Sequence, residues 1–168
     1  FTPYGTASLQ ATAAADWLSY IFYSTDFVDG SQTLSVDYST QPLQGLVAQY
    51  VCTGVRVSSP FRGAATTGTG TATPATIAVP SAVGDVVIDA LVSGVLNAGI
   101  SPTLGSGQTQ QYNVAVGVDN ADIAASYEPG TAGNVTMDWT SMTGVDAWAL
   151  VGGSLVPAAS NRATLLLE

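Results

Sequence analysis

The stretch 134-NVTMDWTSM-142 decides the fold class, because apolar and polar residues alternate in it from Asn134 to Thr140. Val135, Met137 and Trp139 share one face of an extended chain, and the polar residues between them share the other. A period of two is typical of a β-strand with one face in a core and the other in solvent. We therefore expect a strand here, with its three apolar side chains pointing inward.

Similar stretches recur along the chain, and residues rich in Gly, Pro, Ser, Thr, Asn or Asp separate them. Many short strands with such punctuation predict an all-β protein, and about ten of them fit two packed sheets better than one open sheet. The sequence thus predicts an antiparallel β-sandwich (a jelly roll) with little helix. We expect one domain over residues 1–160, followed by a separate strand over 161–168. The remaining predicted strands are 16–23, 33–38, 45–55, 75–80, 84–94, 110–118, 121–130 and 146–157.

Several local expectations follow from the same pattern. Residues 17–23 should form a strand with both faces covered, paired antiparallel with 33–38 through the turn at Asp29-Gly30. The Ala-rich residues 7–18 should form no more than a short helical turn, and residues 64–74 belong to the longest loop. Gly152-Gly153 predicts a bulge or a bend in the last long strand.

Charge is scarce and one-sided in this sequence. Charged residues make up 9% of the chain, with 12 acidic residues against three arginines, no lysine and no histidine, for a net charge of −9. Nucleic-acid binders carry the opposite charge, and an anionic membrane would repel this chain. No apolar stretch is long enough to span a bilayer and no signal peptide is visible. The low charge content suits an extracellular or virion surface, or a subunit buried in an assembly.

Ser–His and Cys–His nucleophile systems are excluded within this chain, because both need a histidine. Cys52 is the only cysteine and lies in an apolar run, so a small core residue is the simplest interpretation. A zinc site would have to use carboxylates and this one thiol, which is implausible.

Paired carboxylates are the remaining route to acid–base chemistry. Asp85 and Asp89 flank one predicted strand, and Asp37, Asp138 and Glu128 come from others. Two of them could act together only if the fold joined them. Most are expected at outward or turn positions, where aspartate serves solubility and capping. We therefore predict that the protein is not an enzyme.

Oxygen ligands for calcium occur in two stretches. Asp26 and Asp29 lie in one, and Asp119, Asn120 and Asp122 lie in the other. Neither matches the EF-hand pattern, and Asx residues in turns explain both without a metal. We predict no metal or cofactor, and calcium stays an open alternative.

Aromatic side chains could bind a glycan if they were exposed. Trp17, Trp139 and Trp148 lie in alternating strands and are expected in the core. Tyr4, Phe61 and Tyr112 lie beside loops and are better candidates for exposure, but they are too dispersed to define a site. The Asn-Val-Thr acceptor pattern at Asn134 lies inside a predicted strand, and we interpret it as chance.

A set of motifs resembles a known family. The motifs are a Gly-Asp followed by an apolar strand (84–91), a GSGQTQ loop (105–110), an EPG turn (128–130), VTMDW (135–139) and a strand from Trp148 to Pro157. Over about residues 66–158 they resemble a module of phage structural proteins and large bacterial surface proteins, which is similar to concanavalin-like, laminin-G-type domains. The resemblance implies a jelly roll with a structural or binding role on a surface. It implies no enzyme and carries over no ligand residues.

The ending 161-NRATLLLE-168 departs from this family, in which a strand resembling it precedes the part that corresponds to residue 1. Such a strand should complete a sheet, either in its own molecule or in a neighbouring subunit, or it opens the next module of a tandem array. Ala163 and Leu165 share a face with Leu167, and Leu166 points the other way. We expect these four residues to form an assembly interface.

Function is predicted from these observations together. We expect a non-enzymatic structural virion protein, a capsid decoration (cement) or fibre protein, located on the virion or outside the cell. Its expected partners are the major capsid protein or copies of itself in a homo-oligomer. The alternatives are a carbohydrate-binding or adhesive surface module, and a subunit of an extracellular filament assembled by strand exchange. Because an initiator Met before Phe is not normally removed, Phe1 is expected to follow a cleavage or further residues.

Overall fold

The computed structural model describes residues 2–11, 15–25, 49–95, 102–116, 121–140, 145–159 and 164–166. Every regular element in these ranges is a β-strand, which confirms the predicted all-β class. No helix long and apolar enough to cross a membrane occurs among them. The strands are β1 (Thr2–Ala11), β2 (Ala15–Tyr23), β3 (Val51–Thr53), β4 (Thr66–Gly70), β5 (Ala75–Ser81), β6 (Val86–Val95), β7 (Thr103–Leu104), β8 (Thr109–Val116), β9 (Ala121–Pro129), β10 (Gly133–Thr140), β11 (Val145–Leu155) and β12 (Thr164–Leu166).

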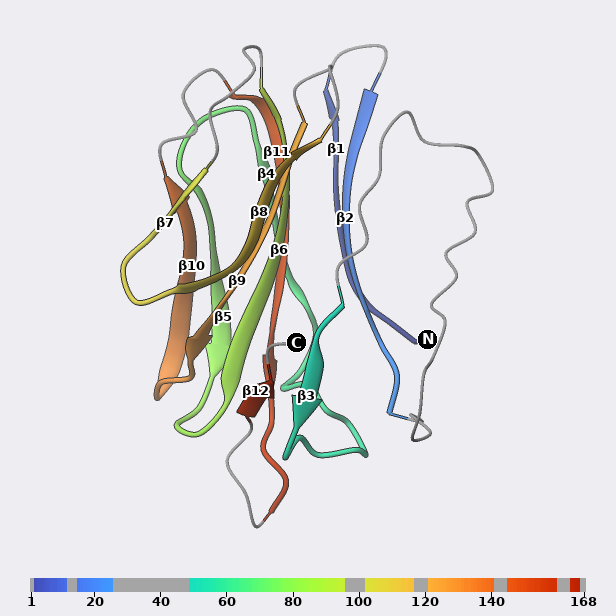
Figure 1. Ribbon diagram of the computed structural model, residues 1–168, viewed down its shortest axis with the longest axis vertical. Coiled ribbons are helices and arrows are strands. Elements are labelled where there is room, and N and C mark those ends of the chain that lie inside the picture. The colour runs from blue at the N-terminus through green and yellow to red at the C-terminus, as the bar shows by residue number, and fades with distance from the viewer. Residues whose placement is uncertain are drawn as a thin grey trace.

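Two antiparallel sheets form the sandwich (Figure 1). One has five strands in the order β4-β11-β6-β9-β8, and the other has three in the order β5-β10-β7. The pairs β4–β11, β5–β10 and β6–β9 are nested, as if one long hairpin had been rolled up, and this is the strand pairing of a jelly roll. At the tip of the hairpin β8 stays beside β9, so the five-stranded sheet is the wider one.

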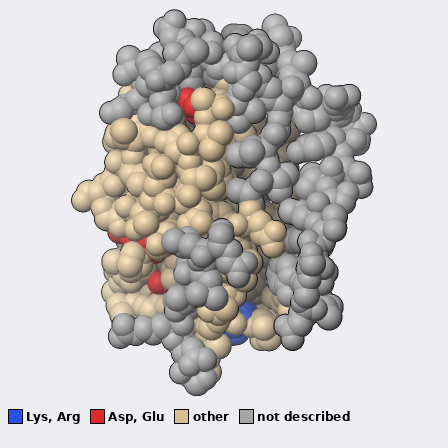
Figure 2. Space-filling model, in the orientation of Figure 1, with Lys and Arg blue, Asp and Glu red and all other residues tan. Residues whose placement is uncertain are grey.

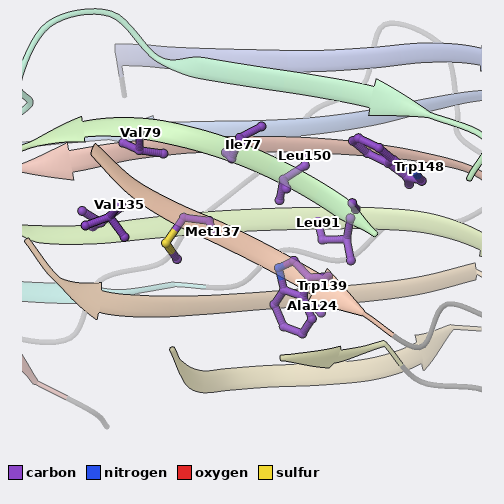
Figure 3. Close-up of a cluster of buried hydrophobic side chains, with 11 residues drawn as sticks. Ile77, Val79, Leu91, Ala124, Val135, Met137, Trp139, Trp148 and Leu150 are labelled. Atoms are coloured by element: carbon purple, nitrogen blue, oxygen red, sulfur yellow. The ribbon is translucent and has the colours of Figure 1, made fainter. Parts of the chain in front are cut away.

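The main core lies between these two sheets (Figure 3). The three inward residues expected from the alternation of β10, Val135, Met137 and Trp139, are all buried there. Leu91 of β6 and Leu150 of β11 meet them from the five-stranded sheet. Trp139 and Trp148 both belong to this core, as predicted, whereas the side chain of Trp17 lies outside the described residues.

A third layer covers the outer face of the five-stranded sheet. The β1–β2 hairpin packs on β11, β6 and β4, and the β3–β12 pair lies beside it (Figure 1). Val92 and Val151 are buried beneath the hairpin, and Ile88 and Leu155 are buried in a cluster that includes Cys52 of β3. The strands β6 and β11 are therefore covered on both faces, which explains why their sequences are nearly continuous apolar runs.

The start of the chain differs from the expectation. The segment predicted as a helical turn contributes to β1, which pairs with β2 over its whole length. Local helix propensity is weak, and backbone pairing with a neighbouring strand overrides it. The predicted pairing of 17–23 with 33–38 concerns residues outside the described ranges, as do Asp29 and Gly30.

Glycines explain two further differences. The predicted loop at 64–74 contains β4, in which a Cβ on Gly70 would lie 2.7 Å from the Trp148 ring, so only glycine lets the indole pack across the strand. The strand β11 runs unbroken through Gly152, and its irregularity falls near Val145 instead. A Cβ on Gly152 would lie 2.7 Å from Ile77 Cδ1, so this glycine permits the two sheets to approach closely.

Candidate functional site: an interaction surface

Asp89 is the centre of a polar network inside the core. Its carboxylate accepts hydrogen bonds from the Ser126 backbone N–H (2.7 Å), the Ser126 hydroxyl (2.9 Å) and the Trp139 indole N–H (2.7 Å). Only 1% of the residue is exposed, and it lies on the core face of β6 between Val87 and Leu91. The expectation that such aspartates point outward is wrong for Asp89, because the donors of β9 and β10 replace its solvation.

Burial raises the pKa of Asp89 to about 7, although the three hydrogen bonds oppose the shift. Tyr50 and Tyr112 are the titratable groups that sense its charge, and burial raises the pKa of both phenols. No cation partners this carboxylate in the described part of the chain. Asp89 therefore joins the two sheets by hydrogen bonds alone.

Asp85 forms a second network at one end of the sandwich. It accepts hydrogen bonds from Arg62 Nε (2.5 Å) and Nη2 (2.9 Å), from the Ser154 hydroxyl (2.8 Å) and from the Ala82 backbone N–H (2.9 Å). Burial alone would raise the pKa of Asp85, but these partners hold it below its usual range. The Asp85 backbone carbonyl also accepts from Gly130 N, which lies at the end of the EPG turn.

The motifs of the sequence meet in these networks. Gln108 of the GSGQTQ loop donates to the Ser126 hydroxyl (2.7 Å) and accepts from the Asp138 backbone N–H (2.8 Å), so it bridges the two sheets. A Cβ on Gly130 would lie 2.5 Å from the Ala82 carbonyl oxygen, so the turn requires glycine. These residues hold the sandwich together, and their contacts are with the scaffold itself.

The candidate acid pair does not come together as a pair. Asp85 and Asp89 belong to separate networks, each filled by its own donors. Glu128 and Asp138 lie on strands of different sheets, half-buried, and Asp37 is outside the described ranges.

The calcium alternative receives no assembled ligand set from the described residues. No group of three acidic, cysteine or histidine side chains gathers there. Asp122 is buried on β9, where burial raises its pKa. Asp26, Asp29, Asp119 and Asn120 lie outside the described ranges, so calcium at those stretches stays a prediction.

On the face shown in Figure 2, few charged atoms are visible among the described residues. Of the charged residues whose exposure is described, Arg56 is exposed, Arg62 has a side chain that is 40% exposed and paired with Asp85, and the acidic ones are buried or half-buried. Large apolar side chains are exposed instead, namely Leu18, Tyr20, Phe22, Val51, Val57, Val83 and Val114.

Three of these exposed side chains form a stripe along β2. Leu18, Tyr20 and Phe22 are 44%, 45% and 53% exposed, and the two rings stack with their centroids 5.7 Å apart. The opposite face of β2 is the covered one, since Ser19 donates to the Ala90 carbonyl (2.8 Å). The prediction that both faces of this strand are covered is therefore wrong, because the hairpin is the outermost described layer on this side.

Two of the aromatic residues predicted to be exposed beside loops are less exposed than the stripe on β2. Phe61 is only 8% exposed and packs edge-on against Tyr23, and Tyr112 is half-buried beside Tyr50. The prediction of exposure is wrong for Phe61, because its loop pairs with the end of β11, and Tyr112 on β8 is only partly exposed. The side chain of Tyr4 lies outside the described set, and Asn134 is exposed on β10.

The C-terminal strand lies beside β3 of the same chain. Thr164, Leu165 and Leu166 pair antiparallel with Thr53, Cys52 and Val51. Ala163 and Leu167 are outside the described residues, so the four-residue assembly interface stays a prediction.

Comparison with known proteins identifies no matching family model, curated protein or solved structure.

Sequence reasoning missed the end of the sandwich formed by Arg56, Val57 and Val83. Of the large apolar residues whose exposure is described, Val57 and Val83 are the most exposed, at 70% and 80%. The available signal was an arginine next to an apolar residue in a Ser/Pro-rich loop, "RVSSP". Such a segment has no periodicity, so its exposure could not be derived from a strand pattern.

Proposed function

We propose that this protein is a non-enzymatic structural protein of a virion, a capsid decoration or fibre protein that binds the particle surface or its own copies. The observation that carries the proposal is a described surface with seven exposed large apolar side chains, on which Arg56 is the exposed charged side chain without an ion-pair partner. The family resemblance of the motifs supports the same class by analogy.

The physical argument concerns what such a surface costs in water. Free-standing soluble domains commonly carry about 25–35% charged residues on their surfaces, and interface cores are depleted in charge and enriched in aromatic residues and arginine. A surface that exposes Tyr20, Phe22 and Arg56 has the second composition. Its repeated copies on a particle or in an oligomer would cover these side chains.

Purified particles provide the test. The protein should remain in fixed stoichiometry with the major shell protein through density-gradient purification, as measured by quantitative mass spectrometry. Particles incubated with the protein carrying Tyr20→Ser and Phe22→Ser should retain less of it than particles incubated with Val114→Ser. A protein found only in the free fraction would refute the proposal.

A carbohydrate-binding or adhesive module is the second candidate, and the exposed Tyr20–Phe22 pair favours it. Aromatic rings bind sugars through their faces, but these two rings stack on one another, which occupies one face of each. A glycan array with and without calcium discriminates the candidates. Binding that is lost with Tyr20→Ala would support the glycan module.

The third candidate is a filament subunit assembled by strand exchange, and it depends on β12. Its three-residue ladder with β3 is short, so replacement by the same strand of a neighbour requires few hydrogen bonds to break. Deletion of residues 161–168 should then leave a monomer. Continued polymerisation of the truncated protein would exclude this candidate.

A further inference from the structure

The loop that carries Arg56 is held rigidly at one end of the sandwich. Arg56 N donates to the Val156 carbonyl (2.9 Å), and Val156 N donates back to the Pro60 carbonyl (2.8 Å). Ala158 N donates to the Gly54 carbonyl (2.7 Å). The loop is therefore bound on both sides to the end of β11, and its tip is a fixed platform.

The guanidinium group of Arg56 is oriented by this platform. Its Nε donates to the Ser59 carbonyl at 3.0 Å. Ser59 has φ of 72°, a left-handed conformation that is unfavourable for a residue other than glycine and turns this carbonyl toward the arginine. Among the described residues, the two terminal nitrogens of Arg56 have no hydrogen-bond partner. Their N–H groups form the fork that binds a carboxylate through two parallel hydrogen bonds.

Exposed apolar side chains accompany this arginine. Val57 follows it directly and is 70% exposed, and Val83, in the turn between β5 and β6, is 80% exposed. Pro157 connects the two segments, since it forms a bridge with Val55 and lies 3.9 Å from the position of a Cβ on Gly84. We call Arg56, Val57 and Val83 the arginine tip. Arginine is one of the residues enriched in interface hot spots, and the exposed valines add apolar area beside it.

We propose that the arginine tip binds a surface carboxylate of a second copy of this chain. Charge favours this occupant, because the chain has 12 acidic residues against three arginines, and among the described acids Glu128 and Asp138 are only half-buried. Among the described side chains Arg56 is the exposed cation without a carboxylate partner, since Arg62 is paired with Asp85, and Figure 2 shows basic atoms at the lower end. The net charge of −9 repels copies at a distance, but a Debye length of about 8 Å at physiological salt screens this repulsion, and a direct contact survives.

The contact is heterologous. Two arginine tips facing each other across a two-fold axis would place like charges together, whereas the tip of one copy against a carboxylate elsewhere on the next does not. Contacts of this kind close into rings or continue into fibres. This inference rests on the proposed structural role and adds to it the surface and the partner.

Self-association measured by analytical ultracentrifugation tests the inference. The wild-type protein should associate with rising concentration, and Arg56→Ala should weaken the association about tenfold to 100-fold. Arg56→Lys keeps the charge but loses the fork, so it should fall between the two. Val57→Ser should also weaken association, whereas Val114→Ser, a matched change at an exposed valine on β8, should not. Circular dichroism verifies that each variant is folded.

Three outcomes would overturn the inference: a monomeric wild-type protein at all concentrations, equal association of Arg56→Ala and wild type, or equal effects of Val57→Ser and Val114→Ser. The proposed function fails separately. If the protein is a fixed component of particles but does not self-associate through Arg56, only this inference falls. If it self-associates through Arg56 and is absent from particles, the virion role falls and the contact stands.

Discussion

Replacement of Asp89 by asparagine tests how the core tolerates a buried carboxylate. The substitution preserves size, so its effect comes from hydrogen bonding and charge. In the wild-type protein both carboxylate oxygens accept, one from Ser126 and the other from the Trp139 indole at 2.7 Å. If the asparagine oxygen keeps the hydrogen bonds from Ser126, the amide N–H groups face the Trp139 indole N–H. Two donors then face each other without an acceptor.

The stability difference between Asp89→Asn and the wild-type protein depends on pH, because the pKa of Asp89 is raised in the folded protein. Asp89 has a pKa of about 7 in the folded protein against 3.8 as the reference value. Its contribution to stability is therefore full below about pH 3.8 and is lost as the pH rises through about 7. Between about pH 4.5 and pH 8 the wild-type protein loses about 3 kcal/mol from this group, and Asp89→Asn loses none of it.

At about pH 4.5 the variant should be less stable by about 2–4 kcal/mol, because two buried donors are unpaired. In the wild-type protein at this pH the Asp89 carboxyl group is protonated, but each of its oxygens keeps a lone pair. One oxygen can still accept from Ser126 and the other from the Trp139 indole. At about pH 8 the deficit should shrink by about 3 kcal/mol or reverse. The variant Trp139→Phe lacks a hydrogen bond that lowers the pKa of Asp89, so this pKa should rise further. The stability of the variant should therefore continue to decline to a higher pH than that of the wild-type protein.

Urea unfolding followed by tryptophan fluorescence measures both variants against wild type at each pH. The other titrating groups are shared by wild type and variant, so they cancel in the difference. A stability gap between Asp89→Asn and wild type that is the same at both pH values would refute the reasoning. It would mean that Asp89 is ionised throughout, and that its hydrogen bonds outweigh its burial.

Three further predictions concern single residues. Arg62→Ala should lower the free energy of unfolding at neutral pH by about 1–3 kcal/mol, because it leaves the buried Asp85 carboxylate without a cation; urea unfolding measures the loss, and no change would contradict the pairing. Gly130→Ala should reduce the melting temperature more than Gly133→Ala, because the added Cβ lies 2.5 Å from a backbone oxygen at the first position and meets nothing within 4 Å at the second, where only the left-handed φ costs about 1–2 kcal/mol. Cys52 should react with iodoacetamide at about pH 8 roughly 100-fold more slowly in the native protein than in the unfolded chain, because burial raises its pKa from 9.0 to about 11; mass spectrometry follows the reaction, and equal rates would show an accessible thiolate.

The fold class could be predicted because each strand carries its own signal. In β10 the alternation assigned Val135, Met137 and Trp139 to the core, and all three are buried. The strand β6 lacks a clean alternation of apolar and polar residues, yet its apolar run between turn residues predicted a strand at 84–94. Period and length are local properties of a sequence, so a single chain suffices to find them.

Whether a strand face or a loop is covered is not a local property of the sequence, and the wrong predictions of exposure concern such coverage. Leu18, Tyr20 and Phe22 are as apolar as a buried face, but they are exposed because the β1–β2 hairpin is the outermost described layer on its side. Phe61 lies in a polar loop, yet it is buried because that loop folds back onto β11. Distant segments decide both outcomes, and the strand pattern contains no information about them.

The same distinction separates the two arginines of one loop. Arg56 and Arg62 are six positions apart in a segment without periodicity, and both are equally plausible surface charges from the sequence. The turn that carries Asp85 reaches Arg62 and neutralises it, whereas the fold brings Arg56 a backbone carbonyl that orients it and no carboxylate from the described residues. Motif residues such as Gln108 and Gly130 are likewise used within the scaffold, so a resemblance based on them predicts architecture. A binding role therefore depends on what the scaffold leaves uncovered, and in the described part of the chain Arg56 is the exposed charged side chain that has no carboxylate partner.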